Sequence, residues 1–289
     1  MTTRHLGIAL ISVAVFIGCA KEYSYERGDP PPVDPPPVPQ PVKNRLISKR
    51  ITEVPDWSYI DSFEYDSQNR CTRLYTNSRL LSLPDTSIYY YDFHYRGNET
   101  LPYKVTDSSH GADMLWLIEY DAQKRKIVDS IQYYSTNSRR VSYYSYSNNR
   151  ITAITTHYQA DTIVVKTRDT FDTDGNNCIR YVGYIDARGR IPDYWWEYSM
   201  THDNKMNPIS KLNIAKSPLF GGDWTTVGDF NALNRNNYIT AAFNSSTSGP
   251  GGVQTFQYTY DADGDPVSAN AKDNLNRSWF LRIKFYYNK

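Results

Sequence analysis

Hydrophobic and polar positions alternate along most of this chain, and one alternating pattern recurs. An apolar residue, a polar residue and a tyrosine are followed by Asp or Ser and a polar turn. The copies are Phe63-Glu64-Tyr65-Asp66, Ile118-Glu119-Tyr120-Asp121, Tyr144-Ser145-Tyr146-Ser147, Trp196-Glu197-Tyr198-Ser199 and Tyr258-Thr259-Tyr260-Asp261. A period of two is typical of a β-strand with one buried face. We therefore expect the apolar residue and the tyrosine to share a face, and the residue between them to face the other way.

The polar segments that follow these copies predict tight turns. They are rich in Asn, Asp and Gly, which tolerate left-handed backbone or form Asx turns and so close hairpins. Turns start near residues 66, 92, 121, 147 and 172, which are 25 to 29 residues apart and leave room for two strands each. More loosely, we expect a turn over 202–208 and a loop over the glycine-rich residues 248–252.

Sequential hairpins predict an all-β fold, a large antiparallel meander. A sheet of about 14 to 18 strands cannot stay flat, because neighbouring strands twist against one another. It must curl into a barrel-like or cradle-like sheet, or split into two layers.

The N-terminal residues are typical of an export signal. Arg4 precedes an apolar run from Leu6 to Ile17, which is too short to span a membrane. The run ends in Phe16-Ile17-Gly18-Cys19, which resembles a bacterial lipobox. The resemblance implies a signal peptide over 1–18, lipidation of Cys19 and, with Ala20 after the cysteine, anchoring in the outer membrane. The alternative is an ordinary signal peptide that contains a cysteine.

A proline-rich segment separates this N-terminus from the rest of the chain. Residues 30–41 read PPPVDPPPVPQP and contain eight of the sixteen prolines. Such a run adopts polyproline II, which spans roughly 37 Å here at about 3.1 Å per residue. We expect residues 19–42 to form a lipidated tether and 43–289 a single all-β domain.

The charge composition argues against nucleic acid as a partner. Lys and Arg number 32 against 31 Asp and Glu, so the net charge of +1 gives no electrostatic drive toward nucleic acid. We expect the outer membrane as a partner through the lipid anchor, with the domain surface-exposed or facing the periplasm. A transmembrane barrel is not expected, because the sequence starts with a lipobox and ends in Asn288-Lys289 rather than an aromatic residue.

Three of the turn motifs resemble a known repeat. They are Tyr65-Asp66 with Asn69-Arg70, Tyr120-Asp121 with Lys124-Arg125, and Tyr260-Asp261-Ala262-Asp263-Gly264, which resemble degenerate YD (RHS-type) repeats. Together with the lipobox and the Y-x-Y-D-x-x-G-x-P-type segment over 258–266, the chain resembles a Bacteroidetes-type lipoprotein family of unknown function with a porin-like fold. The resemblance covers about 45–289. It implies a large curved antiparallel sheet and brings no activity and no catalytic residues.

The search for catalytic or metal-binding motifs leads us to expect no enzyme and no cofactor. Phosphate-binding, dinucleotide-binding, nucleophile-elbow and zinc-binding motifs do not occur in the sequence. The histidines His94, His110, His157 and His202 have no ligand spacing. The Asp-rich segments 172–176 and 261–265 resemble calcium loops but lack the glutamate that an EF-hand needs at its twelfth position, and hairpin turns explain both.

Two further sets of residues leave alternatives open. Glu64, Glu119 and Glu197 could supply paired carboxylates for glycoside hydrolysis. They occupy one repeat position, however, which favours a polar sheet face. Cys71 and Cys178 could form a disulfide in an oxidising compartment, but we expect two free thiols.

Aromatic residues are in surplus, with 26 tyrosines in the chain. We identify Tyr194, Trp195 and Trp196 as candidate ligand-stacking residues, because flat rings cover the apolar face of a sugar. The alternative is that tyrosine is simply a good strand former at a half-wet surface. The leading hypothesis is a non-enzymatic, outer-membrane-anchored lipoprotein that binds a glycan or another envelope component. The alternatives are a scaffolding protein that contacts partner proteins and, less favoured, a hydrolase.

Overall fold

The computed structural model describes residues 45–81, 86–107, 114–186, 194–212, 234–247, 249–274 and 280–288. All of them belong to the compact unit Val42–Lys289. The expected signal peptide, Cys19 and the proline-rich tether lie outside the described residues and stay predictions.

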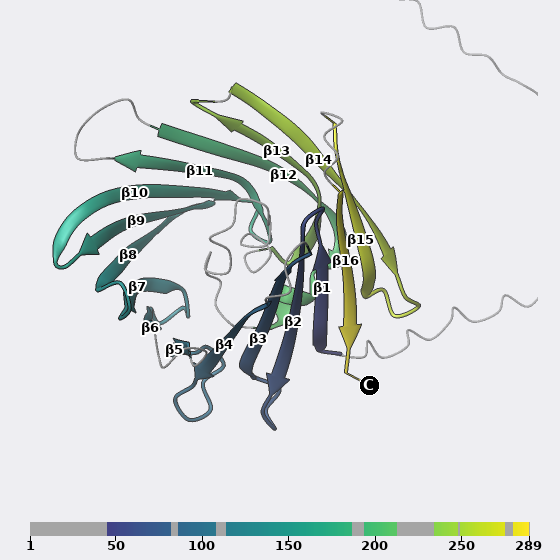
Figure 1. Cartoon of the computed structure of the whole chain (residues 1–289), viewed down its shortest axis with the longest axis horizontal. Coiled ribbons are helices and arrows are strands. Elements are labelled where there is room, and N and C mark those ends of the chain that lie inside the picture. The colour runs from purple at the N-terminus through teal and green to yellow at the C-terminus, as the bar shows by residue number, and fades with distance from the viewer. Residues whose placement is uncertain are drawn as a thin grey trace, which may run out of the picture. The chain divides into compact units, whose positions relative to one another are not determined.

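The described strands form one closed antiparallel barrel, in which each strand pairs with its neighbours in sequence and β1 pairs with β16 (Figure 1). The first eight strands are β1 (Ile47–Glu53), β2 (Trp57–Tyr65), β3 (Cys71–Leu80), β4 (Thr86–His94), β5 (Lys104–Asp107), β6 (Met114–Tyr120), β7 (Lys126–Tyr133) and β8 (Ser138–Ser147). The others are β9 (Arg150–Gln159), β10 (Thr162–Thr173), β11 (Cys178–Asp186), β12 (Tyr194–Met206), β13 (Asn236–Ser245), β14 (Gly249–Tyr260), β15 (Pro266–Asp273) and β16 (Phe280–Tyr287). The expected all-β meander is therefore confirmed, and closure into a barrel settles how it curls.

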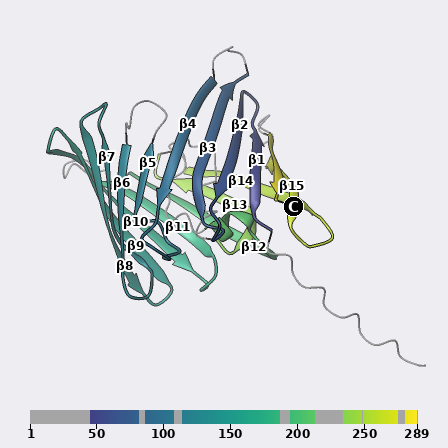
Figure 2. The ribbon, with the colours of Figure 1, turned by 90° about the horizontal axis from the view of Figure 1, so that it is seen from below.

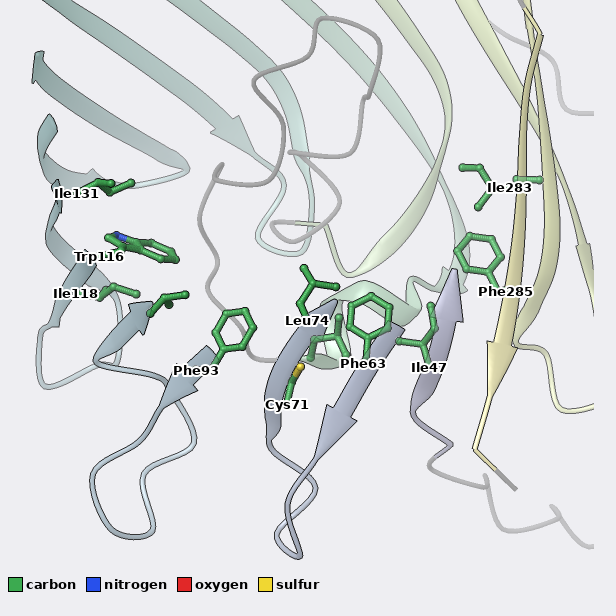
Figure 3. Close-up of a cluster of buried hydrophobic side chains, with 13 residues drawn as sticks. Ile47, Phe63, Cys71, Leu74, Phe93, Trp116, Ile118, Ile131, Ile283 and Phe285 are labelled. Atoms are coloured by element: carbon green, nitrogen blue, oxygen red, sulfur yellow. The ribbon is translucent and has the colours of Figure 1, made fainter. Parts of the chain in front are cut away.

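Alternation along each strand divides the wall into an inner and an outer face. Phe63 and Ile118 are buried, whereas Glu64 and Glu119 are exposed, as the period of two predicts. Figure 3 shows the buried side chains pointing from the strands toward the inside of the barrel. The inner face is thus the apolar one over a large part of the barrel.

Two clusters of buried hydrophobic side chains line the interior. The first consists of Ile47, Phe63, Cys71, Leu74, Phe93, Val105, Trp116, Ile118, Ile131, Leu212, Ala269, Ile283 and Phe285. The second consists of Ala153, Phe171, Cys178, Met200, Tyr238, Ala241, Phe256 and Ala271. Leu212 comes from a short 3₁₀ helix, η1 (Pro208–Leu212), which therefore packs against the first cluster.

Two local expectations are wrong. Residues 202–206 continue β12 to Met206 instead of turning, although the pairing with β13 is irregular there. The glycine-rich segment forms the start of β14 rather than a loop. A Cβ at Gly251 would lie 2.6 Å from the Phe243 ring, and one at Gly252 would lie 2.3 Å from the Asp273 carboxylate, so glycine permits a close strand approach here.

None of the helices in the described part of the chain is long and apolar enough to cross a membrane.

Candidate functional site

The barrel has two rims with different loops. We call the end formed by the turns 66–70, 121–125, 174–177 and 261–265 the Tyr-Asp rim. The opposite end carries the turns 134–137 and 160–161 and the connection after β13, and we call it the far rim. Figure 2 shows the strands running between the two ends. Both buried clusters lie toward the Tyr-Asp rim, since most of their residues are within a few positions of its turns.

The first aspartate of each turn at the Tyr-Asp rim accepts backbone hydrogen bonds within its own turn, and the aspartates of the turn 261–265 also form ion pairs with Arg45. Asp66 Oδ1 accepts hydrogen bonds from the amides of Gln68 and Arg70, each at 2.9 Å, and its Oδ2 accepts one from Arg70 Nε at 2.7 Å. Burial opposes ionisation of Asp66, but the bonds from Arg70 prevail and lower its pKa. Asn69 has a φ of 60°, a left-handed conformation that asparagine tolerates. The turn chemistry expected from the sequence is therefore confirmed, and its carboxylates stabilise hairpins.

Tyrosine hydroxyls bond to the backbone at this rim. Three of the recurring tyrosines donate hydrogen bonds to backbone carbonyls of the preceding hairpin, Tyr65 to Ile47, Tyr120 to Pro102 and Tyr146 to Lys126. Tyr95 and Tyr287 outside the repeat do the same, to Cys71 and Pro266, whereas the recurring Tyr260 donates to the Asp203 carboxylate. Turn arginines cover two of these rings at 4.6 Å, Arg70 over Tyr95 and Arg125 over Tyr146. These tyrosines thus connect neighbouring hairpins at this rim.

The three candidate stacking residues do not share one surface. Tyr194 and Trp196 face inward with their ring centroids 5.7 Å apart, at the far-rim end of β12. Trp196 is paired with Gly183, where a Cβ would lie 2.4 Å from the indole ring. Trp195 pairs with the exposed Tyr184 on the outer face. The three rings therefore lie on both faces of the sheet, as the alternation along a strand predicts, and their stacking on a ligand stays a prediction.

Inward-facing rings continue from Trp196 into the barrel. Tyr181 has its ring centroid 6.4 Å from that of Trp196 and 4.9 Å from that of Phe171 in the second cluster. Tyr198 lies 6.2 Å from Tyr181. These contacts form an aromatic track from the core to the far rim, and its rim end, Tyr194 with Trp196, is only partly buried. Such rings can stack on a ligand that enters from this end.

Charged side chains line the inner wall across β7 to β10, and the sequence analysis missed them as a group. Lys126 Nζ lies 2.7 Å from Asp129 Oδ2, and both side chains are almost completely buried. Burial lowers the pKa of Lys126 to about 8, although Asp129 opposes this effect. Burial also raises the pKa of the Asp169 carboxyl, which accepts a hydrogen bond from Tyr181 at 2.7 Å.

Arg140 is the other inner-wall cation of this region. It pairs with Ile131 on one side and with His157 on the other. Burial lowers the pKa of His157, and the positive charge of Arg140 adds to that effect. Arg140 shares its face with the repeat tyrosines Tyr144 and Tyr146, and this period of two is the signal in the sequence that could have identified it.

The carboxylates considered for hydrolysis are not brought together. Glu64, Glu119 and Glu197 lie on β2, β6 and β12, where the alternation places them on the outer face. Glu197 forms an ion pair with Arg180 at 2.7 Å, and this pairing lowers the pKa of Glu197. Their shared repeat position therefore reflects a polar outer face, as the alternative interpretation proposed.

The histidine and cysteine candidates form no common site among the described residues. Among the described residues, no group of three or more His, Cys, Asp and Glu side chains could hold a metal ion. His94 contacts Thr106 Oγ1 at 3.0 Å, and His110 lies outside the described residues. Cys71 and Cys178 are free and buried, and burial raises the pKa of both thiols to about 12. The expected free thiols are confirmed.

The outer wall is rich in charge. Ion pairs join neighbouring strands there, with N–O distances of 2.6 Å between Arg73 and Asp92 and between Arg150 and Asp172. Large apolar residues are also exposed on this wall, including Tyr143 at 59% and Ile154 at 46%. The inner wall is the more apolar of the two.

Solved structures of other proteins share the architecture of this chain. No protein-family model matches the sequence, and no curated protein matches it either. The crystal structure of a porin-like protein from Bacteroides vulgatus is similar, with a TM-score of 0.57 and 10% identity over 85% of this chain and 99% of that one. A porin-like protein from Bacteroides uniformis gives a TM-score of 0.54 and 11% identity over 84% and 96%. The chain therefore has a porin-like fold.

Proposed function

We propose that this protein is a non-enzymatic lipoprotein of the outer membrane, anchored through Cys19, whose barrel binds a glycan on its inner wall. The observation that carries the proposal is the partly buried pair Tyr194 and Trp196, which faces inward at the far rim. A planar ring covers the apolar face of a pyranose, and neighbouring polar groups bond to its hydroxyls.

The composition of the outer wall supports a lipid anchor rather than a lipid-facing barrel. Membrane barrels carry an apolar outer band and a polar interior. Here Arg73, Arg168 and Lys284 face outward from β3, β10 and β16, and Phe171 and Ile283 face inward. Each outward Arg or Lys would cost about 2–4 kcal/mol at the midplane of a bilayer. An anchor at Cys19 would hold such a barrel beside the membrane.

Two adjacent tryptophans provide a matched test. Trp196→Ala removes the inward ring, whereas Trp195→Ala removes a ring of the same size from the outer face. On a glycan array with the full chain, we expect Trp196→Ala to lose at least tenfold in affinity and Trp195→Ala to bind like the wild type. Near-ultraviolet circular dichroism checks that both variants are folded. Equal losses in both variants, or no glycan bound by the wild type, would contradict the glycan part of this proposal.

The second candidate is a scaffolding role, and one patch on the outer wall favours it. Val128, Tyr143 and Ile154 are paired in one row across β7, β8 and β9, and the last two are well exposed. Rows of exposed apolar side chains often mark protein contacts. If this role holds, Tyr143→Glu abolishes recovery of a specific partner after crosslinking in cells. Unchanged recovery, or no reproducible partner, would count against it.

Protease shaving tests the anchoring and its side. An antibody against the barrel should detect the wild type in the outer-membrane fraction and Cys19→Ala in the soluble envelope fraction. Loss of signal in shaved intact cells would indicate the cell surface, and protection until lysis would indicate the periplasm. An unanchored wild type would contradict the proposal.

A further inference from the structure

Unsatisfied buried polar atoms are concentrated on one part of the inner wall. The described residues contain five buried side-chain nitrogen or oxygen atoms without a hydrogen-bond partner: Trp116 Nε1, Asp129 Oδ1, Arg140 Nε, His202 Nε2 and Asn234 Nδ2. Three of them come from the adjacent strands β6, β7 and β8. Buried polar atoms in folded proteins are nearly always bonded, so each exception calls for a partner such as water, an ion or another molecule.

The strand register brings these three residues close together. Trp116 is paired with Ile131, and Ile131 is paired with Arg140, so Trp116 and Arg140 lie in one row across three strands. Asp129 lies on the middle strand, two positions from Ile131, and shares its face. Figure 3 shows Trp116 and Ile131 side by side and pointing inward. Trp116 and Asp129 are almost completely buried, so Arg140 is the member of this group that is partly open to the interior.

Arg140 also differs from the other inward-facing cations in its charge balance. Arg50 lies 2.7 Å from Asp61, and Lys126 lies 2.7 Å from Asp129. Among the described residues, no carboxylate lies within ion-pair distance of Arg140, and its side chain is only partly exposed. An unpaired, partly buried guanidinium is unfavourable unless an anion neutralises it. The Asp169 carboxylate attracts Arg140 through space but accepts its hydrogen bond from Tyr181, so Arg140 has no directly bonded counter-ion among the described residues.

Arg140 is within reach of a ligand that enters at the far rim. It is the third residue of β8, which starts at Ser138 directly after the far-rim turn 134–137. At about 3.3 Å per residue, its Cα lies about 7 Å inside that rim. Ile131, opposite it, is completely buried and belongs to the first cluster. Arg140 therefore lies where the apolar packing of the core begins.

We propose that Arg140 binds the acidic group of a sugar that enters the barrel from the far rim. A guanidinium bonds the oxygens of a carboxylate or of a sulfate ester through charge-assisted hydrogen bonds. A uronic acid carries the first of these groups, and a sulfated sugar carries the second. This inference rests on the proposed glycan binding and specifies the class of glycan as acidic.

The test compares acidic oligosaccharides with neutral ones on the full chain. The probes are trigalacturonate, the same trisaccharide with its carboxyl groups reduced, and a sulfated trisaccharide, each titrated calorimetrically, together with an array of acidic and neutral glycans. We expect an acidic probe to bind at least tenfold more tightly than its neutral counterpart. Trigalacturonate and the sulfated sugar distinguish a carboxylate from a sulfate ester as the bound group.

The variants Arg140→Gln and Arg139→Gln provide the matched pair, because they are neighbours on β8 that face opposite sides of the wall. Arg140→Gln should lose about tenfold or more in affinity for the acidic probe, and Arg139→Gln should lose less than twofold. If Arg140→Gln does not fold, the preference of the wild type for acidic over reduced probes decides instead.

Three outcomes would overturn the inference. Equal affinity for acidic and neutral glycans would refute it and leave the proposed glycan binding intact. Equal losses in Arg140→Gln and Arg139→Gln would indicate unspecific attraction of anions. No glycan bound at all would refute both proposals, and the unpaired atoms would then be satisfied by water only.

Discussion

The Tyr-Asp rim and the far-rim half of the inner wall use similar residue types in different ways. At the Tyr-Asp rim, Tyr146 donates to a backbone carbonyl and Asp66 accepts from the amides of its own turn. Toward the far rim, Tyr194 and Trp196 are partly buried rings, and Arg140 Nε has no partner among the described residues. A surplus of aromatic residues alone therefore does not indicate a binding site. Bonded tyrosines stabilise the barrel, and groups left unsatisfied are available to a ligand.

The largest loss of stability is expected from truncating a side chain in the core behind the Tyr-Asp rim. Phe171 is 2% exposed and packs in the second cluster, so Phe171→Ala should lower the free energy of unfolding by about 3–5 kcal/mol. Urea unfolding of the full chain measures this loss. Trp196→Ala should lower the free energy of unfolding by less than Phe171→Ala does, and it should weaken glycan binding more. A Phe171→Ala variant as stable as the wild type would contradict the division into a packed half and a binding half.

Two tyrosines on β8 are expected to differ in how much they contribute to stability, with an effect of intermediate size. The Tyr146 hydroxyl donates to the Lys126 carbonyl at 2.8 Å, whereas Tyr143 is 59% exposed on the outer face. Tyr146→Phe should lower the free energy of unfolding by about 0.5–1.5 kcal/mol, the net value of one hydrogen bond. Tyr143→Phe should change it by less than about 0.5 kcal/mol. The same unfolding experiment measures both. Equal changes would show that the Tyr-Asp hydrogen bonds do not stabilise the barrel.

The smallest expected effect is the loss of stability at low pH that results from protonation of Asp66. Hydrogen bonds from Arg70 outweigh burial and lower the pKa of Asp66 below its ordinary value of 3.8. The stability that ionised Asp66 contributes is therefore present above pH 3.8 and is lost as the pH falls through the lowered pKa. The difference in stability between the wild type and Asp66→Asn should shrink between about pH 5 and about pH 2, the range around the ordinary and the lowered pKa of Asp66. The difference between wild type and Tyr146→Phe should stay constant, and a parallel decrease of both would contradict the assignment.

The sequence predicts the walls of this barrel well because period-two alternation is a local property. It placed Phe63 and Ile118 on the buried face and Glu64 on the other, and the structure agrees. It could not predict that β1 pairs with β16, since that pairing joins the two ends of the domain. It also misread the glycines of β14, whose role depends on the approach of Phe243 and Asp273 from neighbouring strands.

The candidate site was predicted only in part. Tyr194, Trp195 and Trp196 were identified because aromatic rings are in surplus, and the alternation along the strand places Tyr194 and Trp196 on one face and Trp195 on the other. Arg140 was missed because its significance depends on what it lacks, namely a carboxylate in the folded barrel. Whether a charged strand residue has such a partner follows from the register of neighbouring strands, and a single sequence does not provide that register.

Photo-crosslinking can locate the ligand directly and so test whether it binds at the inner wall toward the far rim. An array-identified glycan that carries a diazirine would be irradiated with the full chain, and the modified residues would be located by mass spectrometry. We expect modification at inward positions, including Arg140 and Trp196, and not at their outward neighbours Arg139 and Trp195. Modification of the outward neighbours, or of the Tyr-Asp turns such as 66–70, would contradict it.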